Sequence, residues 1–181
     1  MKTVRLLGFV LVFSLAAQLA AAGQVIFVVR HAERADRPAA AAPAPSGRAQ
    51  APHGMMIAND VPLNAAGRER AQRLAATLRS AGIKHIFTTE YQRTRQTAAP
   101  LAEALHVKPV LTAAKDLDPL AAALKRLKEP ALVVGHADTV PELLKKLGVA
   151  GEITIGDAEY DNLFVVVRGA TGPPTLIRLR Y

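Results

Sequence analysis

Apolar and polar residues follow one another along this chain in a pattern typical of strands that alternate with helices. Short, continuous apolar runs are typical of strands buried on both faces, and they occupy residues 24–29, 85–88 and 131–134. Apolar residues at helical spacing occupy residues 64–80, 89–105, 118–128 and 140–147. This alternation predicts a three-layer α/β/α fold with a mostly parallel central sheet.

Several element boundaries carry a recognisable end signal. Asn64 is predicted to be the N-cap of the first of these helices. Thr89, with Gln92 three residues later, has the pattern of a capping box, and Asp118-Pro119 has the N-cap and N1 residues of a further helix. The remaining apolar runs predict short strands at residues 107–111, 152–155, 163–168 and 175–180.

Residues 1–22 are predicted to be a secretory signal peptide. Lys2 and Arg5 precede an apolar stretch that ends in Ala20-Ala21-Ala22-Gly23, a small-residue cleavage site. The alternative is an uncleaved membrane anchor, since the apolar stretch is near the shortest length that spans a bilayer. A strand that starts at residue 24 leaves no linker after an anchor, which favours cleavage. We therefore expect a periplasmic or secreted protein with one domain over residues 23–181 and no stable membrane insertion.

Residues 34–58 are rich in alanine and proline and are expected to form a flexible insertion. The segment begins three residues after His31, which places its ends near any site built around that residue. It lacks apolar periodicity, and this favours a linker over a lid that closes on a ligand.

The composition excludes several classes of site. The chain has 181 residues and no cysteine, so a disulfide scaffold, a thiolate zinc site and a cysteine nucleophile are all ruled out. A formal net charge of +8 favours anionic partners. Nucleic acid is not expected among them, because no nucleic-acid-binding motif is present and only 4% of the residues are aromatic.

Candidate chemistry collects where the predicted strands end. Arg30 and His31 follow the first strand, Arg93 lies in the helix after the second, and His136 follows the strand at residues 131–134. The carboxyl ends of the strands in an open α/β sheet face the ligand crevice. We therefore expect these side chains to meet at one edge of the sheet, although they are far apart in the sequence.

Four short motifs occur in a fixed order between residues 25 and 147. They are Arg30-His31-Ala32-Glu33, Pro62-Leu63-Asn64-x-x-Gly67, residues 89–97 (TEYQRTRQT) and Gly135-His136. In this order they resemble the R-H-[GA], P-L-[ST]-x-x-G, S-x-x-x-R-[AT]-x-[QE]-T and second-histidine motifs of the histidine phosphatase superfamily, also called phosphoglycerate-mutase-like. The resemblance implies a compact, exported member of that family, with its phosphoglycerate-mutase-like fold and phosphoryl-transfer chemistry.

The same residues suit phosphoryl transfer on chemical grounds. A neutral imidazole is a good nucleophile when one ring nitrogen is available and the other donates to a fixed acceptor, so His31 is predicted to form a phosphohistidine. Guanidinium groups bind phosphoryl oxygens through paired hydrogen bonds, so Arg30 and Arg93 are predicted to bind the phosphoryl group together with His136. We expect no metal and no cofactor. Arg95 is expected to be structural, and surface or packing roles are expected for His53, His85 and His106.

The general acid that protonates the leaving group is not identified by the sequence. The family's usual G-x-x-E-G surroundings are missing between Arg93 and His136. Asp116 and Asp118 lie in that stretch, although Asp118 is also explained as a helix cap, and Glu33 and Asp138 lie beside the two histidines. Glu103 and Glu129 also lie between Arg93 and His136.

The function that follows is a metal-independent hydrolase of phosphomonoesters that acts through a phosphohistidine on His31. Its substrate is expected to be a phosphorylated small molecule or a phosphoprotein. The resemblance also implies hydrolysis in preference to phosphoryl movement between hydroxyls, because relatives that move phosphate carry large insertions around the site and none follows Arg93. Two alternatives stay open, namely a phosphatase of phosphohistidine or another phosphorylated protein side chain, and a catalytically silent phospholigand-binding protein of the cell envelope. The oligomeric state is not predicted.

Overall fold

The computed structural model describes residues 23–36 and 60–181 of the chain. The predicted signal peptide, nearly all of the alanine- and proline-rich insertion, and His53 lie outside these residues. The predictions made for those segments therefore stay predictions. In the part that the structure describes, no helix is long and apolar enough to cross a membrane.

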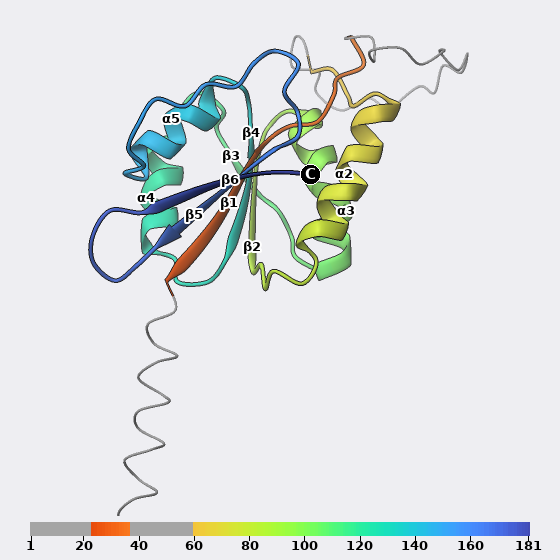
Figure 1. Cartoon of the computed structure of the whole chain (residues 1–181). Coiled ribbons are helices and arrows are strands. Elements are labelled where there is room, and N and C mark those ends of the chain that lie inside the picture. The colour runs from red at the N-terminus through yellow and green to blue at the C-terminus, as the bar shows by residue number, and fades with distance from the viewer. Residues whose placement is uncertain (1–22, 37–59) are drawn as a thin grey trace, which may run out of the picture.

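Strands and helices alternate along the described chain, as the sequence predicts (Figure 1). The strands are β1 (Gln24–Arg30), β2 (His85–Thr89), β3 (Val110–Thr112), β4 (Ala131–Gly135), β5 (Asn162–Arg168) and β6 (Thr175–Arg180). The helices are α2 (Ala65–Leu78), α3 (Gln92–Leu105), α4 (Asp118–Arg126) and α5 (Thr139–Lys146).

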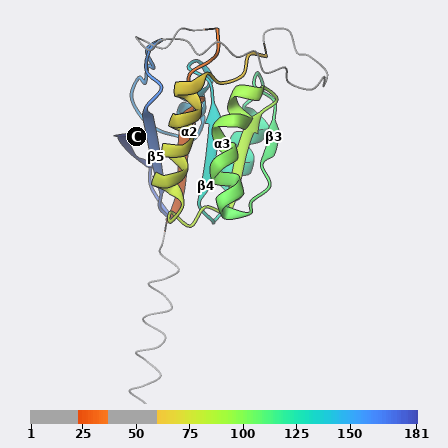
Figure 2. The same ribbon diagram turned by 90° about the vertical axis from the view of Figure 1, so that its right-hand side faces the viewer.

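The strands form one six-stranded sheet in the order β3-β2-β4-β1-β5-β6. The four strands from β3 to β1 are parallel, and β5 and β6 are antiparallel to their neighbours. Helices α2 and α3 cover one face of the sheet while α4 and α5 cover the other (Figures 1 and 2). The predicted three-layer α/β/α fold with a mostly parallel sheet is confirmed.

Strand β1 supplies side chains to the cores on both faces of the sheet. Ile26 and Val28, fully buried, pack in the core beneath α4 and α5, whereas Val29 packs in the core beneath α2 and α3. Successive side chains of a strand point to opposite faces, and both faces of β1 are covered. The strand is therefore apolar without interruption from Val25 to Val29, and Arg30 follows at the carboxyl edge of the sheet.

Helix α2 begins as predicted, with the Asn64 side chain accepting a hydrogen bond from the Gly67 N–H at 2.8 Å. Gly67 also lies against the segment that follows His31. A Cβ atom on Gly67 would stand 2.3 Å from the Glu33 carbonyl oxygen. This close approach explains the glycine of the P-L-N-x-x-G motif, because the start of α2 packs directly on the Glu33 backbone, two residues after the candidate nucleophile.

We expect Gly67→Ala to destabilise the fold even though alanine is the better helix former. Helix propensity alone would favour alanine by about 1 kcal/mol. The clash with backbone atoms forces the helix to shift, and strain of this kind costs typically about 1–3 kcal/mol. Urea denaturation should show a lower midpoint for Gly67→Ala than for the wild type. The exposed Gln72→Ala on the same helix is the control, and a Gly67→Ala protein as stable as that control would contradict the explanation.

The capping box predicted at Thr89 is wrong. Thr89 is the last residue of β2, and α3 begins at Gln92 with Tyr91 at the N-cap position and no capping side chain of its own. The Gln92 N–H instead donates to Asp60 Oδ1 at 2.6 Å. The Thr89 hydroxyl contacts Thr94 and His136, and it accepts from the Tyr91 N–H at 3.4 Å, before the first residue of the helix.

Asp118 is also not the cap that the sequence predicted. The N-cap position of α4 is Leu117, and Asp118 lies in the first turn with its carboxylate 2.6 Å from Lys146 Nζ. The predicted edge strand at residues 107–111 begins only after Pro109, which has no N–H to donate, and runs as β3.

Residues 152–155, predicted as a strand, adopt no regular structure. Both sides of β5 are already paired, with β1 and with β6, so no neighbouring sheet edge is open to this segment. Ile153 and Ile155 pack partly buried against the core on the α4 and α5 side. The alternation of apolar and polar residues in this segment therefore comes from a loop that packs every second side chain against the core, and not from a strand.

Candidate active site

The two histidines of the predicted site lie side by side because their strands are neighbours. Arg30 and Gly135, the last residues of β1 and β4, are paired in register, and the His31 N–H donates to the Gly135 carbonyl at 2.9 Å. His31 and His136 follow directly. Their ring centroids are 5.3 Å apart, with the planes at 64°. The expected convergence at the carboxyl edge of the sheet is therefore present.

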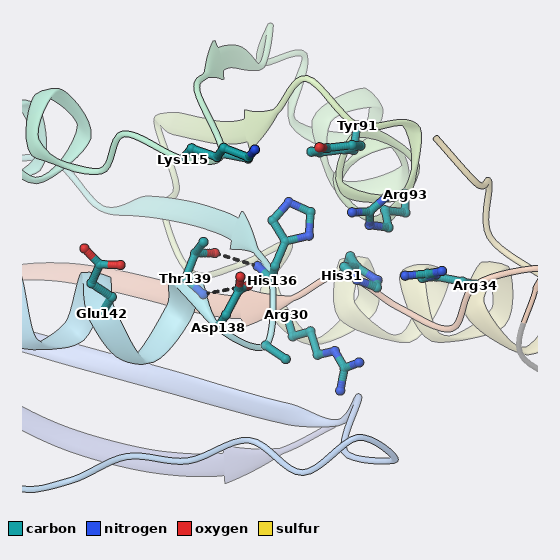
Figure 3. A pocket seen from close by; sticks show the side chains of 12 residues that line it. Arg30, His31, Arg34, Tyr91, Arg93, Lys115, His136, Asp138, Thr139 and Glu142 are labelled. Atoms are coloured by element: carbon teal, nitrogen blue, oxygen red, sulfur yellow. Dashed lines mark hydrogen bonds between the residues drawn. The ribbon is translucent and has the colours of Figure 1, made fainter. Parts of the chain in front are cut away.

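A cavity of about 430 Å³ opens at this edge of the sheet. Figure 3 shows Tyr91 and Arg93 on the side of α3, Lys115 on the loop before α4, and the start of α5 around the two histidines. The lining residues are Arg30, His31, Arg34, Tyr91, Arg93, Ala114, Lys115, His136, Ala137, Asp138, Thr139 and Glu142. Cationic side chains outnumber carboxylates here, which suits an anionic ligand.

His31 is held as a neutral imidazole with a defined tautomer. Its Nδ1 lies 2.7 Å from the carbonyl oxygen of Ala32, which can only accept, so Nδ1 carries the hydrogen. Burial, with smaller effects of the nearby His136 and Arg93, lowers the pKa of His31 to about 3, although the Ala32 hydrogen bond acts in the opposite direction. At neutral pH, Nε2 therefore has an available lone pair, as a nucleophile requires.

His136 is likewise neutral at physiological pH. Burial, with the positive charge of Arg93 close by, lowers its pKa to about 4, although Asp138 and Glu90 oppose the change. Its Nε2 lies 3.1 Å from Thr89 Oγ1. Its backbone N–H donates to Thr139 Oγ1 at 3.0 Å, which fixes the residue at the start of α5 (Figure 3).

These lowered pKa values predict a loss of stability in mild acid. In the unfolded chain a histidine has a pKa near 6.5 and is protonated below that pH. In the folded protein, His31 and His136 stay neutral until the pH falls to about 3 and about 4, respectively. The stabilising contribution is complete above about pH 6.5 and is lost as the pH falls towards those values. Each histidine contributes a slope of at most about 1.4 kcal/mol per pH unit.

Urea denaturation of the wild type between about pH 7 and pH 5, beside His31→Gln/His136→Gln, measures this slope. The free energy of unfolding should fall more steeply with acid in the wild type than in the double variant. Parallel profiles would show that the two imidazoles titrate normally in the fold.

Arg93 extends from the first turn of α3 into the cavity (Figure 3). Its guanidinium stacks on the Tyr91 ring, with Cζ 4.1 Å from the ring centroid. Burial and the nearby Arg34 lower its pKa, yet a guanidinium stays charged at neutral pH. The N–H groups at the start of the same helix favour anions. The position agrees with the predicted phosphoryl-binding role.

The Arg30 side chain is directed differently from the others. Its Nη1 donates to the carbonyl oxygens of Gly156, Asp157 and Glu159 at 3.0–3.2 Å, and its guanidinium lies 4.1 Å from the centroid of the Tyr160 ring. Figure 3 shows it pointing away from the two histidines. In this conformation Arg30 fastens the loop before β5, and its predicted contact with a phosphoryl group stays a prediction.

Two of the carboxylates considered as general acids are engaged elsewhere. Glu33 forms a bidentate ion pair with Arg70, whose Nη2 is 2.6 Å from Glu33 Oε1. Asp118 pairs with Lys146. Neither lines the cavity, and the exposed Asp116, which accepts from the Asp118 N–H, does not line it either. Glu103 lies in a separate groove at the end of α3, and Glu129 lies 3.7 Å from His85.

Asp138 is the sequence-predicted acid that does line the cavity. It stands at the N-cap of α5, where its Oδ1 accepts from the Thr139 N–H at 2.9 Å (Figure 3). Glu142, one turn further along α5, lines the cavity as well and was not considered from the sequence. Arg95, expected to be structural, lies away from the cavity, 3.9 Å from Asp60.

The other cationic or aromatic lining residues that the sequence did not single out are Arg34, Tyr91 and Lys115. Lys115 reaches the cavity because the Ala114 N–H donates to Glu90 Oε2 at 3.0 Å, which joins the loop before α4 to the end of β2. Such contacts depend on tertiary packing, and no local sequence pattern predicts them. Within residues 23–36 and 60–181, no group of three or more histidine and carboxylate side chains is placed to hold a metal ion.

Comparison with known proteins agrees with this geometry. A family model described as the histidine phosphatase superfamily (branch 1) matches residues 26–117, just over half of the chain. The chain belongs to this superfamily. It is also 44% identical over 52 residues to a probable phosphoglycerate mutase, GpmB, of Yersinia enterocolitica. That match spans 29% of this chain and only 24% of the relative.

Solved structures of phosphatases share the fold. The protein histidine phosphatase SixA in complex with tungstate matches with a TM-score of 0.60 at 16% identity, over 86% of this chain and 96% of that one. A putative SixA from Agrobacterium tumefaciens has a TM-score of 0.55 at 22% identity, over 87% and 98%. A mycobacterial glucosyl-3-phosphoglycerate phosphatase has a TM-score of 0.57 at 13% identity, over 87% and 97%. Membership of the superfamily, with neighbours of these kinds, supports an enzyme of the phosphatase class over a silent binding protein.

Proposed function

We propose that this protein is a metal-independent phosphomonoester hydrolase that forms a phosphohistidine on Nε2 of His31. The observation that carries the proposal is the hydrogen bond between His31 Nδ1 and the Ala32 carbonyl. It leaves Nε2 as the basic nitrogen of a buried, neutral imidazole that lines the cavity. A nucleophile held in one tautomer by a fixed acceptor needs no separate activation.

The reaction has two steps. Nε2 of His31 attacks phosphorus, the N–P bond forms, and the P–O bond to the leaving group breaks. Water then attacks the phosphohistidine, the N–P bond breaks and its electron pair returns to Nε2. Arg93 and His136 contact the phosphoryl oxygens throughout, and a fixed donor such as the Arg93 guanidinium is worth about 10²–10³ in rate.

Asp138 is the proposed proton donor to the leaving oxygen. It is the one of the six carboxylates considered from the sequence that lines the cavity, and one of its carboxylate oxygens already accepts from the Thr139 N–H. The other oxygen is the one assigned to protonating the leaving group, and the carboxylate that remains takes the proton of the attacking water in the second step. General acids contribute typically about 10²–10⁴ in rate when the leaving group is a poor one.

A phosphohistidine or protein phosphatase is the second candidate. It is favoured by the fold that the chain shares with two SixA structures, described as a protein histidine phosphatase and as a putative phosphohistidine phosphatase. Under the first proposal the substrate is instead a phosphorylated small molecule, such as those acted on by the glucosyl-3-phosphoglycerate phosphatase. Export through the predicted signal peptide, with a mature chain beginning near Gly23, completes the proposal.

Three substrates distinguish these functions, namely an aryl phosphate, an alkyl phosphate and a protein phosphorylated on histidine. The proposed hydrolase turns over both small esters, and ethylenediaminetetraacetate leaves the rates unchanged. Asp138→Asn should slow the alkyl ester by about 10²-fold or more and the aryl ester far less, because only the alkoxide needs the proton. Asp116→Asn is the matched control and should behave as the wild type.

Turnover of the phosphoprotein with neither ester hydrolysed would replace the first candidate by the second. No turnover of any of the three would contradict both. Equal slowing of the alkyl and aryl esters by Asp138→Asn would remove Asp138 from the acid role.

A further inference from the structure

Two buried threonines join His136 to the start of α3. Thr89 Oγ1 lies 3.1 Å from His136 Nε2 and 2.9 Å from Thr94 Oγ1. Thr89 is 5% exposed and Thr94 is fully buried. Because both hydroxyls are buried, each hydroxyl hydrogen points to one of these neighbouring acceptors. The Tyr91 N–H, 3.4 Å from Thr89 Oγ1, takes up one lone pair of that oxygen.

The neighbouring carbonyl groups determine where each hydrogen points. Thr94 Oγ1 lies 2.8 Å from the Tyr91 carbonyl oxygen and 3.2 Å from that of Thr89. Carbonyl oxygens only accept, so the single hydroxyl hydrogen of Thr94 points to one of them. In the 2.9 Å contact between the two hydroxyls, the Thr94 oxygen is therefore the acceptor, and the Thr89 hydroxyl donates its hydrogen to that oxygen. The Thr89 oxygen must accept from His136, which places the imidazole hydrogen on Nε2.

This arrangement leaves Nδ1 as the basic nitrogen of a neutral His136. The ring lines the cavity, and no hydrogen bond within the described part of the chain engages Nδ1. Without a hydrogen, Nδ1 cannot donate to a phosphoryl oxygen, and the lone pairs of Nδ1 and of that oxygen repel each other. The fixed donor expected of His136 is therefore absent in the empty site and must be created when the ligand binds.

We propose that Thr89, supported by Thr94, is a positioning residue that fixes the Nε2–H form of His136, so that a phosphoryl group binds together with one proton shared between Nδ1 and a phosphoryl oxygen. The inference rests on the proposed phosphoryl site. The positive charges of Arg93 and Arg30 oppose this extra proton, and Asp138 and Glu90 favour it. His31, which packs edge-on against His136, stays neutral because its own hydrogen is held by Ala32.

Calorimetric titration with inorganic phosphate tests the proton directly. At about pH 8.5, where phosphate is mainly the dianion, binding measured in buffers of different ionisation enthalpy should take up about one proton per phosphate. Thr89→Val removes the acceptor of Nε2–H, lets the hydrogen move to Nδ1, and should bring the uptake close to zero. Thr89→Ser keeps the hydroxyl and should keep the uptake. Uptake near zero in the wild type, or unchanged in Thr89→Val, overturns the proposal.

Nitrogen-15 NMR of the histidine rings gives a second readout that needs no variant at Thr89. In the phosphate-free wild type, His136 should be in the Nε2–H form and His31 in the Nδ1–H form, assigned through His136→Gln and His31→Gln. An Nδ1–H form of His136 overturns the proposal whatever the enzyme hydrolyses. Neither measurement depends on turnover, so an inactive protein with the expected tautomer and proton uptake would count against the proposed function alone.

Discussion

His31→Gln should reduce hydrolysis of an aryl phosphate by at least about 10⁴-fold, since removing the nucleophile of a covalent mechanism removes the reaction path itself. The carboxamide of glutamine can still donate to the Ala32 carbonyl, which now accepts from Nδ1. It offers no basic nitrogen in place of Nε2. The fold should survive, because the imidazole that it replaces is buried and neutral.

His85→Gln is the matched control for this substitution. His85 lies at the opposite end of β2 from the cavity, 3.7 Å from Glu129, and does not line the site. Steady-state kinetics should show wild-type rates for His85→Gln and background rates for His31→Gln. Residual turnover of His31→Gln within about tenfold of the wild type would exclude His31 as the nucleophile.

Arg93→Ala should lower kcat/KM by about 10²–10³-fold and weaken the binding of inorganic phosphate in parallel. The guanidinium lies in the cavity at the start of α3, on the Tyr91 ring, and under the proposed function it binds both the ground-state phosphoryl group and its transition state. Arg93→Lys keeps the charge but loses the fork that contacts two oxygens at once. It should therefore fall between the wild type and Arg93→Ala.

Arg95→Ala separates this specific effect from a loss of positive charge. Arg95 is two residues further along the same helix, half-exposed, and faces Asp60 instead of the cavity. Its removal changes the net charge by the same amount as Arg93→Ala, and its kinetics should stay within about twofold of the wild type. Equal losses in the two variants would indicate that long-range attraction, and not contact, explains the effect.

The sequence predicts the parts of this site that local patterns and strand topology determine. His31 and His136 each follow an apolar run, and parallel neighbouring strands bring such positions together by register. Arg93 was located in the same way, from its place early in a helix that follows β2. Nothing beyond strand order and motif spacing is needed for these three residues.

The parts that the sequence does not predict depend on side-chain partners far along the chain. The sequence places Glu33 two residues after His31, but Arg70 on α2 binds its carboxylate. The sequence predicts that Arg30 faces the phosphoryl site, but carbonyl groups of the loop before β5 hold its guanidinium. Thr89 had the local pattern of a helix cap and is instead bonded to His136. In each case the choice of partner is made by tertiary packing, which local spacing does not encode.

The most direct test of the covalent mechanism is the intact mass of the protein shortly after mixing with an activated aryl phosphate, with wild type and His31→Gln measured side by side under quenched conditions. The mechanism predicts a phosphoryl mass on the wild type that disappears with time as the phenol is released, and no added mass on His31→Gln. An adduct of equal yield on His31→Gln, or release of phenol by His31→Gln at the wild-type rate, would contradict a phosphohistidine on His31.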